Sequence, residues 1–221
     1  MSPYLFRSRT EAGLQLAAKL QHLKGTHPLV LALPRGGVPV AAQIAEALDG
    51  ELDLLLVHKL GLPFQPELAM GAVTDGTHPR TFVNWAVVNE AKIPEAEVQA
   101  AAAREIAELE RQRKLWRAED AAIPIQDRIV IIVDDGVATG SSVRVALEAV
   151  RHAAARKIVL AIPVAASKSA AGLMADCDEA VFLATPKDFQ AVGQYYADFH
   201  QLEDWEIHRL LHRPAPDGTV H

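Results

Sequence analysis

Two adjacent carboxylates, Asp134 and Asp135, stand directly before a turn rich in glycine and hydroxyl groups. A helix that begins on such a turn attracts an anion through its unpaired N–H groups and its dipole. The acidic pair would repel an anion, so one ligand has to satisfy both ends of the segment. A sugar phosphate does so, with its phosphate on Thr139 to Ser142 and its hydroxyls, or a bound Mg²⁺, at the acidic pair.

The elements that must position these groups follow from the same stretch. Five consecutive β-branched residues, Ile129 to Val133, predict a strand buried on both faces, which is typical of a parallel sheet covered by helices. Gly136 and Gly140 allow a tight turn, and Ser141 or Ser142 is predicted to cap a helix over 143–155. The alternative is a core strand and a capped helix without a ligand, but a core strand needs neither paired acids nor a hydroxylic turn.

Short apolar runs alternate with amphipathic segments along the rest of the chain. Strands are expected at 29–33, 52–57, 158–164 and 180–184, a hairpin at 70–74 and 81–84, and helices at 8–23, 38–48, about 94–119, 168–175 and 203–211. This alternation predicts an α/β fold with a doubly wound, mainly parallel five-stranded sheet. An order of 3-2-1-4-5 would make 29–33 and 129–133 neighbours, so that their loops share the crevice where such sheets bind ligands.

The segment 129–142 resembles the signature of the type I phosphoribosyltransferases, which has four or five apolar residues, two acids, a short spacer, Thr-Gly and small hydroxylic residues. The resemblance implies the fold of that family, with a small C-terminal hood. In the family this segment binds the ribose 5-phosphate part of 5-phosphoribosyl 1-diphosphate (PRPP). By resemblance Asp134 and Asp135 would hold the ribose 2′- and 3′-hydroxyls. The 5′-phosphate would lie on Ala138, Thr139, Gly140, Ser141 and Ser142.

A second turn, Arg35-Gly36-Gly37, follows the predicted strand 29–33 and offers a guanidinium and a closely approachable backbone to a diphosphate. In the resembled family this position is the pyrophosphate loop, and it would face the acidic pair across the pocket. Lys59 follows the second strand, at the same edge of the sheet, where family members often place a basic residue against the diphosphate. A surface arginine and a solvated lysine are the alternatives.

The resemblance extends over most of the chain. The loop 59–73 and the tail 186–199 are similar to a less characterised, stand-alone branch of the family. We therefore expect one phosphoribosyltransferase domain over 1–221, with a helical insertion at about 86–126 and a hood or tail at about 185–221. In this family a variable hood holds the acceptor, often by stacking a ring, so Phe189 or Tyr195 could serve. Packing of a small aromatic tail onto the core is the alternative.

The resemblance implies Mg²⁺-dependent transfer of a 5-phosphoribosyl group from PRPP to a nitrogenous, nucleobase-like acceptor, with release of pyrophosphate. The implied catalytic residues are Asp134, Asp135, Arg35 and Lys59. One departure is informative, because enzymes that salvage 6-oxopurines usually carry a carboxylate where this chain has Ala138. A 6-oxopurine acceptor is thus disfavoured. The main alternative is a non-catalytic regulatory protein that binds PRPP or a nucleotide; a phosphatase or phospho-acceptor is weaker, because the Asp-x-Asp-Gly-Thr arrangement is absent.

Composition limits the partners and the compartment. With 221 residues and a net charge of −6, the chain suits one generous domain and disfavours nucleic acid as a partner. The single Cys177 cannot form an internal disulfide, the N-terminal stretch lacks a secretory apolar run, and the longest apolar run is far short of the roughly 20 residues that span a bilayer. We expect a cytoplasmic protein without membrane contact.

Two helical patterns remain open. The long helix carries an apolar stripe that could pack on its own domain, cover the pocket or pair with a second subunit as a homodimer; its members are Val98, Ala102, Ile106, Leu109 and Trp116. His208 and His212 are four residues apart, as metal ligands on one helix face can be. No third ligand is evident, so we interpret them as part of a solvated tail helix.

Overall fold

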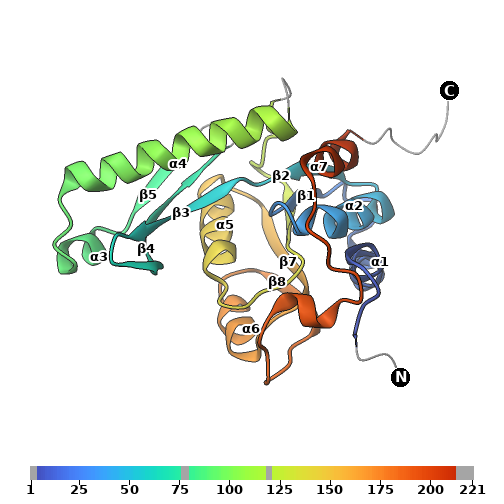
Figure 1. Cartoon of the computed structure of the whole chain (residues 1–221). Helices are drawn as coiled ribbons and strands as arrows, with labels where there is room; N and C mark the ends of the chain where they lie inside the picture. Colours follow the sequence, from blue (N-terminus) through green and yellow to red (C-terminus); the bar gives the residue numbers. More distant parts are fainter. Residues whose placement is uncertain (1–3, 76–79, 118–120, 213–221) are drawn as a thin grey trace.

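The computed structural model of the protein describes residues 4–75, 80–117 and 121–212, apart from the side chains of Pro66, Glu67 and Arg80. Its centre is a five-stranded sheet in which every neighbouring pair of strands is parallel (Figure 1). In spatial order the strands are β2 (Glu51–Leu54), β1 (Leu29–Ala32), β6 (Ile129–Val133), β7 (Lys157–Val164) and β8 (Glu179–Ala184). The predicted α/β class and the adjacency of β1 and β6 are confirmed.

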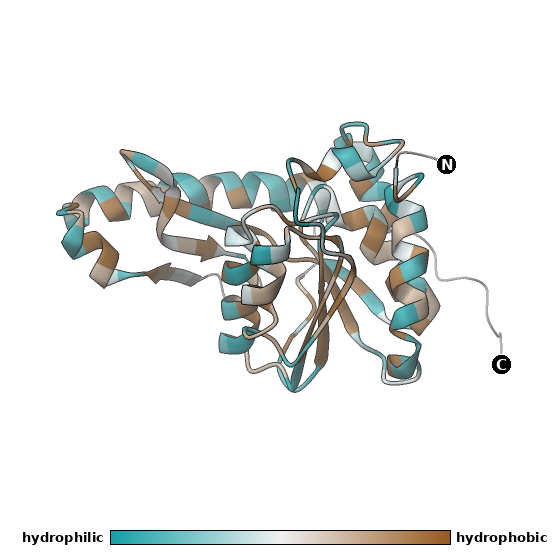
Figure 2. Ribbon diagram, turned by 90° about the horizontal axis from the view of Figure 1, so that it is seen from below, coloured by the Kyte–Doolittle hydropathy of each residue, from teal (hydrophilic) through white to brown (hydrophobic). Residues whose placement is uncertain are grey.

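Helices cover both faces of this sheet, because alternate strand residues point to opposite layers. Val30 and Ile131 pack on the side of α1 (Arg9–Lys19) and α2 (Gly37–Leu48). Leu31 and Ile132 pack on the side of α5 (Ser141–His152) and α6 (Ser167–Leu173). The hydropathy colouring of Figure 2 shows apolar strands between helices whose outer faces are polar. The central strands are therefore buried among apolar side chains on both faces, as the β-branched run predicts.

An arm extends from this core and departs from the predicted strand order (Figure 1). The chain leaves the parallel sheet after Leu54 and forms a separate antiparallel sheet of β3 (Val57–Leu62), β4 (Gln65–Thr74) and β5 (Arg80–Val83). The predicted order 3-2-1-4-5 places a third strand beside the second. In the structure β2 is itself an edge strand of the parallel sheet, so that part of the prediction is wrong. A parallel partner requires a long crossover connection, whereas β3 and β4 are joined by a short turn.

Two helices complete the arm. They are α3 (Trp85–Glu90) and the long α4 (Glu95–Trp116). The predicted stripe on α4 is buried at Val98, Ala102, Leu109 and Trp116, which join the same apolar core as α1 and α2. The stripe therefore packs within its own chain.

The tail returns to the N-terminus. A 3₁₀ turn (Val192–Tyr195) leads into residues 196–203, which we call the strap, and then into α7 (Asp204–Leu211). The strap lies beside the first described residues: the Ala197 N–H donates to the Phe6 carbonyl at 2.9 Å, and the Asp198 N–H donates to the Arg7 carbonyl at 2.9 Å. The strap thus runs beside the N-terminal segment before the chain enters α7.

The helix ends follow the predictions to within a few residues. Helix α1 ends at Lys19 rather than at residue 23, and at its start Ser8 accepts the Glu11 N–H while the Glu11 carboxylate accepts the Arg7 N–H. Helix α2 ends at Leu48, and its C-cap Asp49 lies in the left-handed region (φ 53°). Within the described residues, no helix combines the length and apolar character that crossing a membrane requires.

Candidate active site

The loop after β6 leads directly into α5. Gly140 precedes the helix with φ 79°, a left-handed conformation that glycine adopts without strain. Ser141 and Ser142 are therefore the first two helical residues, and the prediction that one of them caps α5 is wrong. No side chain caps this helix, and the Thr139 and Ser141 hydroxyl oxygens lie 3.3 Å apart. The first-turn N–H groups and hydroxyls can thus serve a ligand anion.

The turn between β1 and α2 packs against the acidic pair. A Cβ built on Gly36 would lie 2.1 Å from Asp135 Oδ2, and one on Gly37 would lie 2.5 Å from the Val133 carbonyl oxygen and 3.0 Å from Asp134 Cα. Only glycine fits at such separations. The Pro34–Arg35 peptide bond in the same turn is cis. The two predicted loops are in direct contact at the carboxyl ends of β1 and β6.

Asp135 is buried in an ion pair that the sequence did not reveal. Arg9 Nε donates to Asp135 Oδ2 at 2.7 Å, and the Tyr196 hydroxyl donates to the Asp135 backbone carbonyl at 2.6 Å. Asp134 is partly exposed, and its Oδ1 accepts the Asp135 N–H at 2.8 Å. Burial raises the pKa of Asp135, and Arg9 opposes that shift. Burial, and next the neighbouring Asp135 charge, raise the pKa of Asp134 well above its ordinary value.

Arg35 points to the strap rather than to the acidic pair. Its Nη1 donates to the Leu202 carbonyl at 3.0 Å, and its Nη2 lies 3.2 Å from Asp204 Oδ1. The indole Nε1–H of Trp116 donates to that same oxygen at 2.7 Å. The Arg35 side chain keeps 35% of its surface exposed, so its guanidinium can still reach solvent or a ligand.

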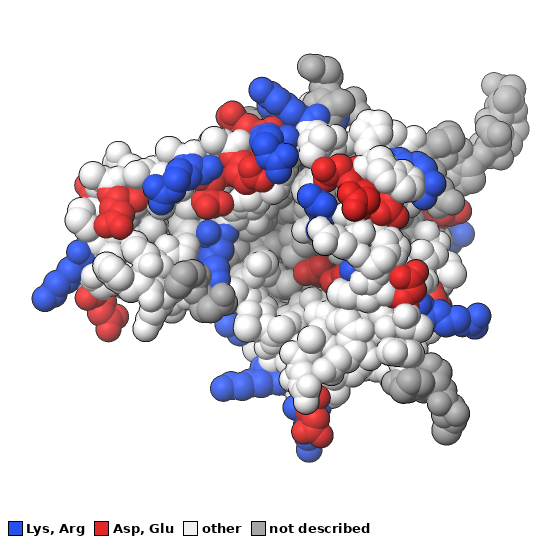
Figure 3. All heavy atoms as spheres, in the orientation of Figure 1, with Lys and Arg blue, Asp and Glu red and all other residues white. Residues whose placement is uncertain are grey.

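Lys59 lies on the arm. The sequence predicts it in the loop after the second strand, at the edge of the main sheet, but it lies inside β3, opposite Ala72 of β4. The reason is the early end of β2, after which the chain enters the antiparallel sheet. The arm and the body border a hollow with basic and acidic side chains on its rim, as Figure 3 shows.

The two candidate acceptor-binding rings stack on each other. The centres of the Phe189 and Tyr195 rings are 5.4 Å apart, with an angle of 29° between the ring planes, and both side chains are half-buried. They pack against a small cluster that contains Phe6 and Tyr196. Much of their surface thus holds the hood to the core, in agreement with the alternative that the sequence left open.

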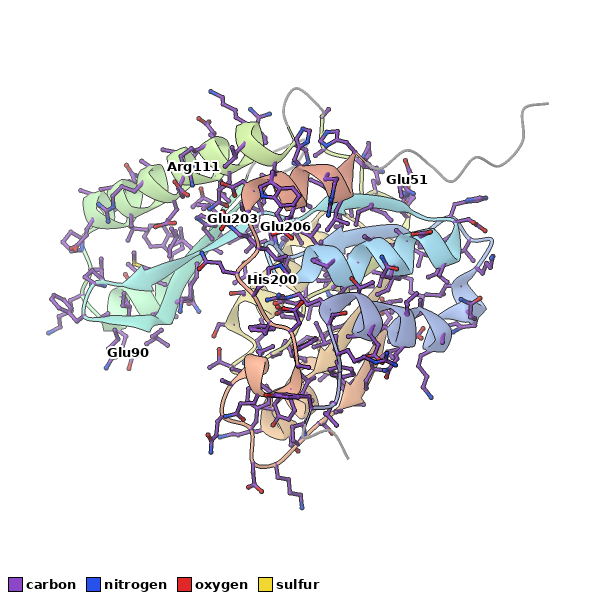
Figure 4. The ribbon with its side chains drawn as sticks, turned by 45° about the vertical axis from the view of Figure 1, so that its right-hand side comes forward. Glu51, Glu90, Arg111, His200, Glu203 and Glu206 are labelled. Carbon is purple, nitrogen blue, oxygen red and sulfur yellow. The ribbon has the colours of Figure 1, made fainter. Side chains whose placement is uncertain are left out.

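Sequence reasoning missed the residues that surround Asp135. Arg9 lies at the start of the helix predicted over 8–23, and Tyr196 is one aromatic among several in the tail. The strap adds His200, whose Nδ1 lies 3.0 Å from Asp198 and whose Nε2 lies 3.3 Å from Glu206. Figure 4 shows His200, Glu203 and Glu206 close together where the strap enters α7. A pattern read along one segment does not signal such long-range contacts.

The fold and these loops define a doubly wound α/β protein with a candidate ligand site at its topological switch point. Residues 11–200 match the family model "Phosphoribosyl transferase domain". The chain therefore belongs to this family.

Two curated relatives come from strains of Mycobacterium tuberculosis and are named "Putative phosphoribosyl transferase" MT0597 and Rv0571c. Each is 43% identical over 214 residues, which is 96% of this chain and 48% of the relative. The chain thus spans about half the length of these curated relatives.

Two solved structures are similar to this chain. The crystal structure of TT1426 from Thermus thermophilus is 39% identical, with a TM-score of 0.79 over 93% of this chain and 97% of that one. AQ2163 from Aquifex aeolicus, at 11% identity and a TM-score of 0.51, covers 94% of this chain and 86% of its own, and shares the fold.

Proposed function

We propose that the protein is a Mg²⁺-dependent phosphoribosyltransferase that moves the 5-phosphoribosyl group of PRPP to a nitrogenous, nucleobase-like acceptor and releases pyrophosphate. One observation carries the proposal: the turn of Gly36 and Gly37 packs against Asp134 and Asp135 at the switch point, and the uncapped start of α5 follows on the same loop. Membership of the phosphoribosyl transferase family supports it.

Each part of PRPP has a candidate partner. The 5′-phosphate binds the backbone and hydroxyls of residues 138–142. The ribose hydroxyls bind the acidic pair, and the diphosphate lies along the turn of residues 35–37. Arg35, helped by Lys59 from the arm, stabilises the charge of the departing diphosphate, while the acidic pair holds the ribose in line for the acceptor nitrogen.

Mg²⁺ fits this site as a substrate-borne ion. Among the described residues, no group of three or more His, Cys, Asp or Glu side chains could hold a metal without help. Mg²⁺ is commonly held by one or two carboxylates together with substrate phosphates, and Asp134 and Asp135 supply such carboxylates near the proposed diphosphate. When bound, the ion would neutralise charge on the leaving diphosphate.

The acceptor is proposed to lie under the hood, where the exposed parts of Phe189 and Tyr195 offer a ring to stack on. Enzymes of this family that salvage 6-oxopurines usually carry a carboxylate where this chain has Ala138. We therefore infer an acceptor other than a 6-oxopurine. The single cysteine suits a cytoplasmic protein.

A screen of nucleobases with PRPP and Mg²⁺, followed by pyrophosphate release, tests the proposal. At least one acceptor should give release that Asp134→Asn abolishes. Asp127→Asn is the matched control, because Asp127 precedes β6, is exposed and has φ 59°, which asparagine tolerates. Saturable PRPP binding without release for any acceptor would favour the regulatory alternative. Failure to bind PRPP would contradict both functions.

A further inference from the structure

Arg9 makes its side-chain contacts with segments far away in the sequence. It is the first residue of α1, and its side chain is 10% exposed. Besides its bond to Asp135, its Nη1 donates to the His200 carbonyl at 3.0 Å, and its guanidinium carbon lies 3.9 Å from the centre of the Phe199 ring. One buried cation thus joins the N-terminal helix, the acidic loop and the strap.

The position of this cation is unfavourable for the helix itself. A positive charge in the first turn opposes the helix dipole, and a buried guanidinium costs free energy unless it is paired. Its placement is therefore accounted for by Asp135. Removal of either member of a buried pair leaves the other charge without compensation.

The contacts of Asp135 come from three directions. Gly36 lies against both of its carboxylate oxygens, Tyr196 holds its backbone carbonyl, and Arg9 holds Oδ2. Asp134 is more exposed than Asp135, and its side chain accepts a hydrogen bond from the Asp135 N–H. A shift of the Asp135 side chain would thus also disturb the orientation of Asp134 and of the turn that faces it.

We propose that Arg9 is a positioning residue for the PRPP site: it fixes the carboxylate of Asp135, and through it the geometry of the acidic pair that meets the ribose. The inference rests on the proposed function. Arg9 acts through Asp135, and its contacts with the His200 carbonyl and the Phe199 ring hold the guanidinium in place.

The experiment measures PRPP affinity by calorimetry with Mg²⁺ present, beside the urea midpoint of each variant. Arg9→Met should weaken PRPP binding by about tenfold or more, because small displacements of binding groups have effects of this size. Arg9→Lys, which keeps the charge and one donor, should restore part of the affinity. Arg7→Met is the matched control, since Arg7 stands two residues away with 90% of its side chain exposed, and it should bind PRPP like the wild type.

A double-mutant cycle distinguishes two ways in which Arg9 could affect PRPP binding: through the position of Asp135, or through its contacts with the strap. In an Asp135→Asn background, Arg9→Met should cause little further loss of PRPP affinity, because the group it positions is already gone. An equal loss in both backgrounds would overturn the inference, as would an Arg9→Met variant that binds PRPP within twofold of the wild type. If Arg9→Met does not fold, Arg9→Lys decides: it must bind PRPP at least about threefold more weakly than the wild type. Failure of the wild type to bind PRPP would instead remove the proposed function, and this inference with it.

Discussion

Gly36 lies against the carboxylate of Asp135 so closely that a Cβ on Gly36 would fall 2.1 Å from Oδ2. The contact joins the two loops that follow β1 and β6, which are far apart in the sequence. It also means that the acidic pair and the β1–α2 turn cannot move independently.

Gly36→Ala should therefore damage the site. The added methyl group forces the Asp135 side chain or the turn to move, at a cost of about 1–3 kcal/mol in unfolding free energy, and PRPP affinity should fall by at least about tenfold. Calorimetry and urea unfolding measure the two effects. Gly172→Ala in α6 is the control, because its Cβ would meet only the flexible end of Arg144. Wild-type PRPP affinity in Gly36→Ala would contradict the assigned contact.

Asp134→Asn should stabilise the fold while it weakens PRPP binding. Burial raises the pKa of Asp134, so the folded state holds a proton that the unfolded state has lost at the same pH. The contribution of Asp134 to stability is therefore complete below its ordinary pKa of 3.8 and is lost as the pH rises through the raised pKa. The amide carries no such cost. Urea midpoints at pH 5 and pH 8 should show a larger gain for Asp134→Asn at pH 8; an equal effect at both would refute the argument.

The sequence predicted the central part of this fold and less of its periphery. The β-branched strand and the glycine turns are local signals, so the parallel sheet and the meeting of the two loops followed from residues 29–37 and 129–142. The arm was harder, because whether 57–62 joins the parallel sheet or an antiparallel one depends on long-range pairing. Arg9 and Tyr196 approach Asp135 from opposite ends of the chain, and no pattern within one segment indicates that contact.

A buried ion cluster should stabilise the junction between the arm and the core. Arg117 binds Asp53 and Asp75 and donates to the Leu54 carbonyl at 2.6 Å, and its side chain is 5% exposed. Arg117→Met leaves two buried carboxylates without their cation and should cost about 3–5 kcal/mol in unfolding free energy. Arg113→Met, at an exposed position in the last turn of α4, should change it by less than about 0.5 kcal/mol. Equal midpoints in urea for the two variants would show that the cluster contributes nothing.

His200 should titrate above its ordinary pKa of 6.5, because hydrogen bonds to Asp198 and then to Glu206 favour the charged imidazole. Any stability from these pairs is complete below pH 6.5 and is lost as the pH rises through the raised pKa. An NMR titration of the imidazole measures it directly. Asp198→Asn and Glu206→Gln should each lower the pKa of His200, whereas an unchanged value in both would show that the strap does not hold these pairs in solution.

A crystal structure of the protein with PRPP and Mg²⁺ would show directly whether the loops after β1 and β6 form the PRPP site. The 5′-phosphate is expected on the N–H groups of residues 139–142, a ribose hydroxyl within hydrogen-bond distance of Asp134, and the diphosphate beside the turn of residues 35–37. A 5′-phosphate bound away from the start of α5, or a ribose that does not contact the acidic pair, would contradict the proposed site.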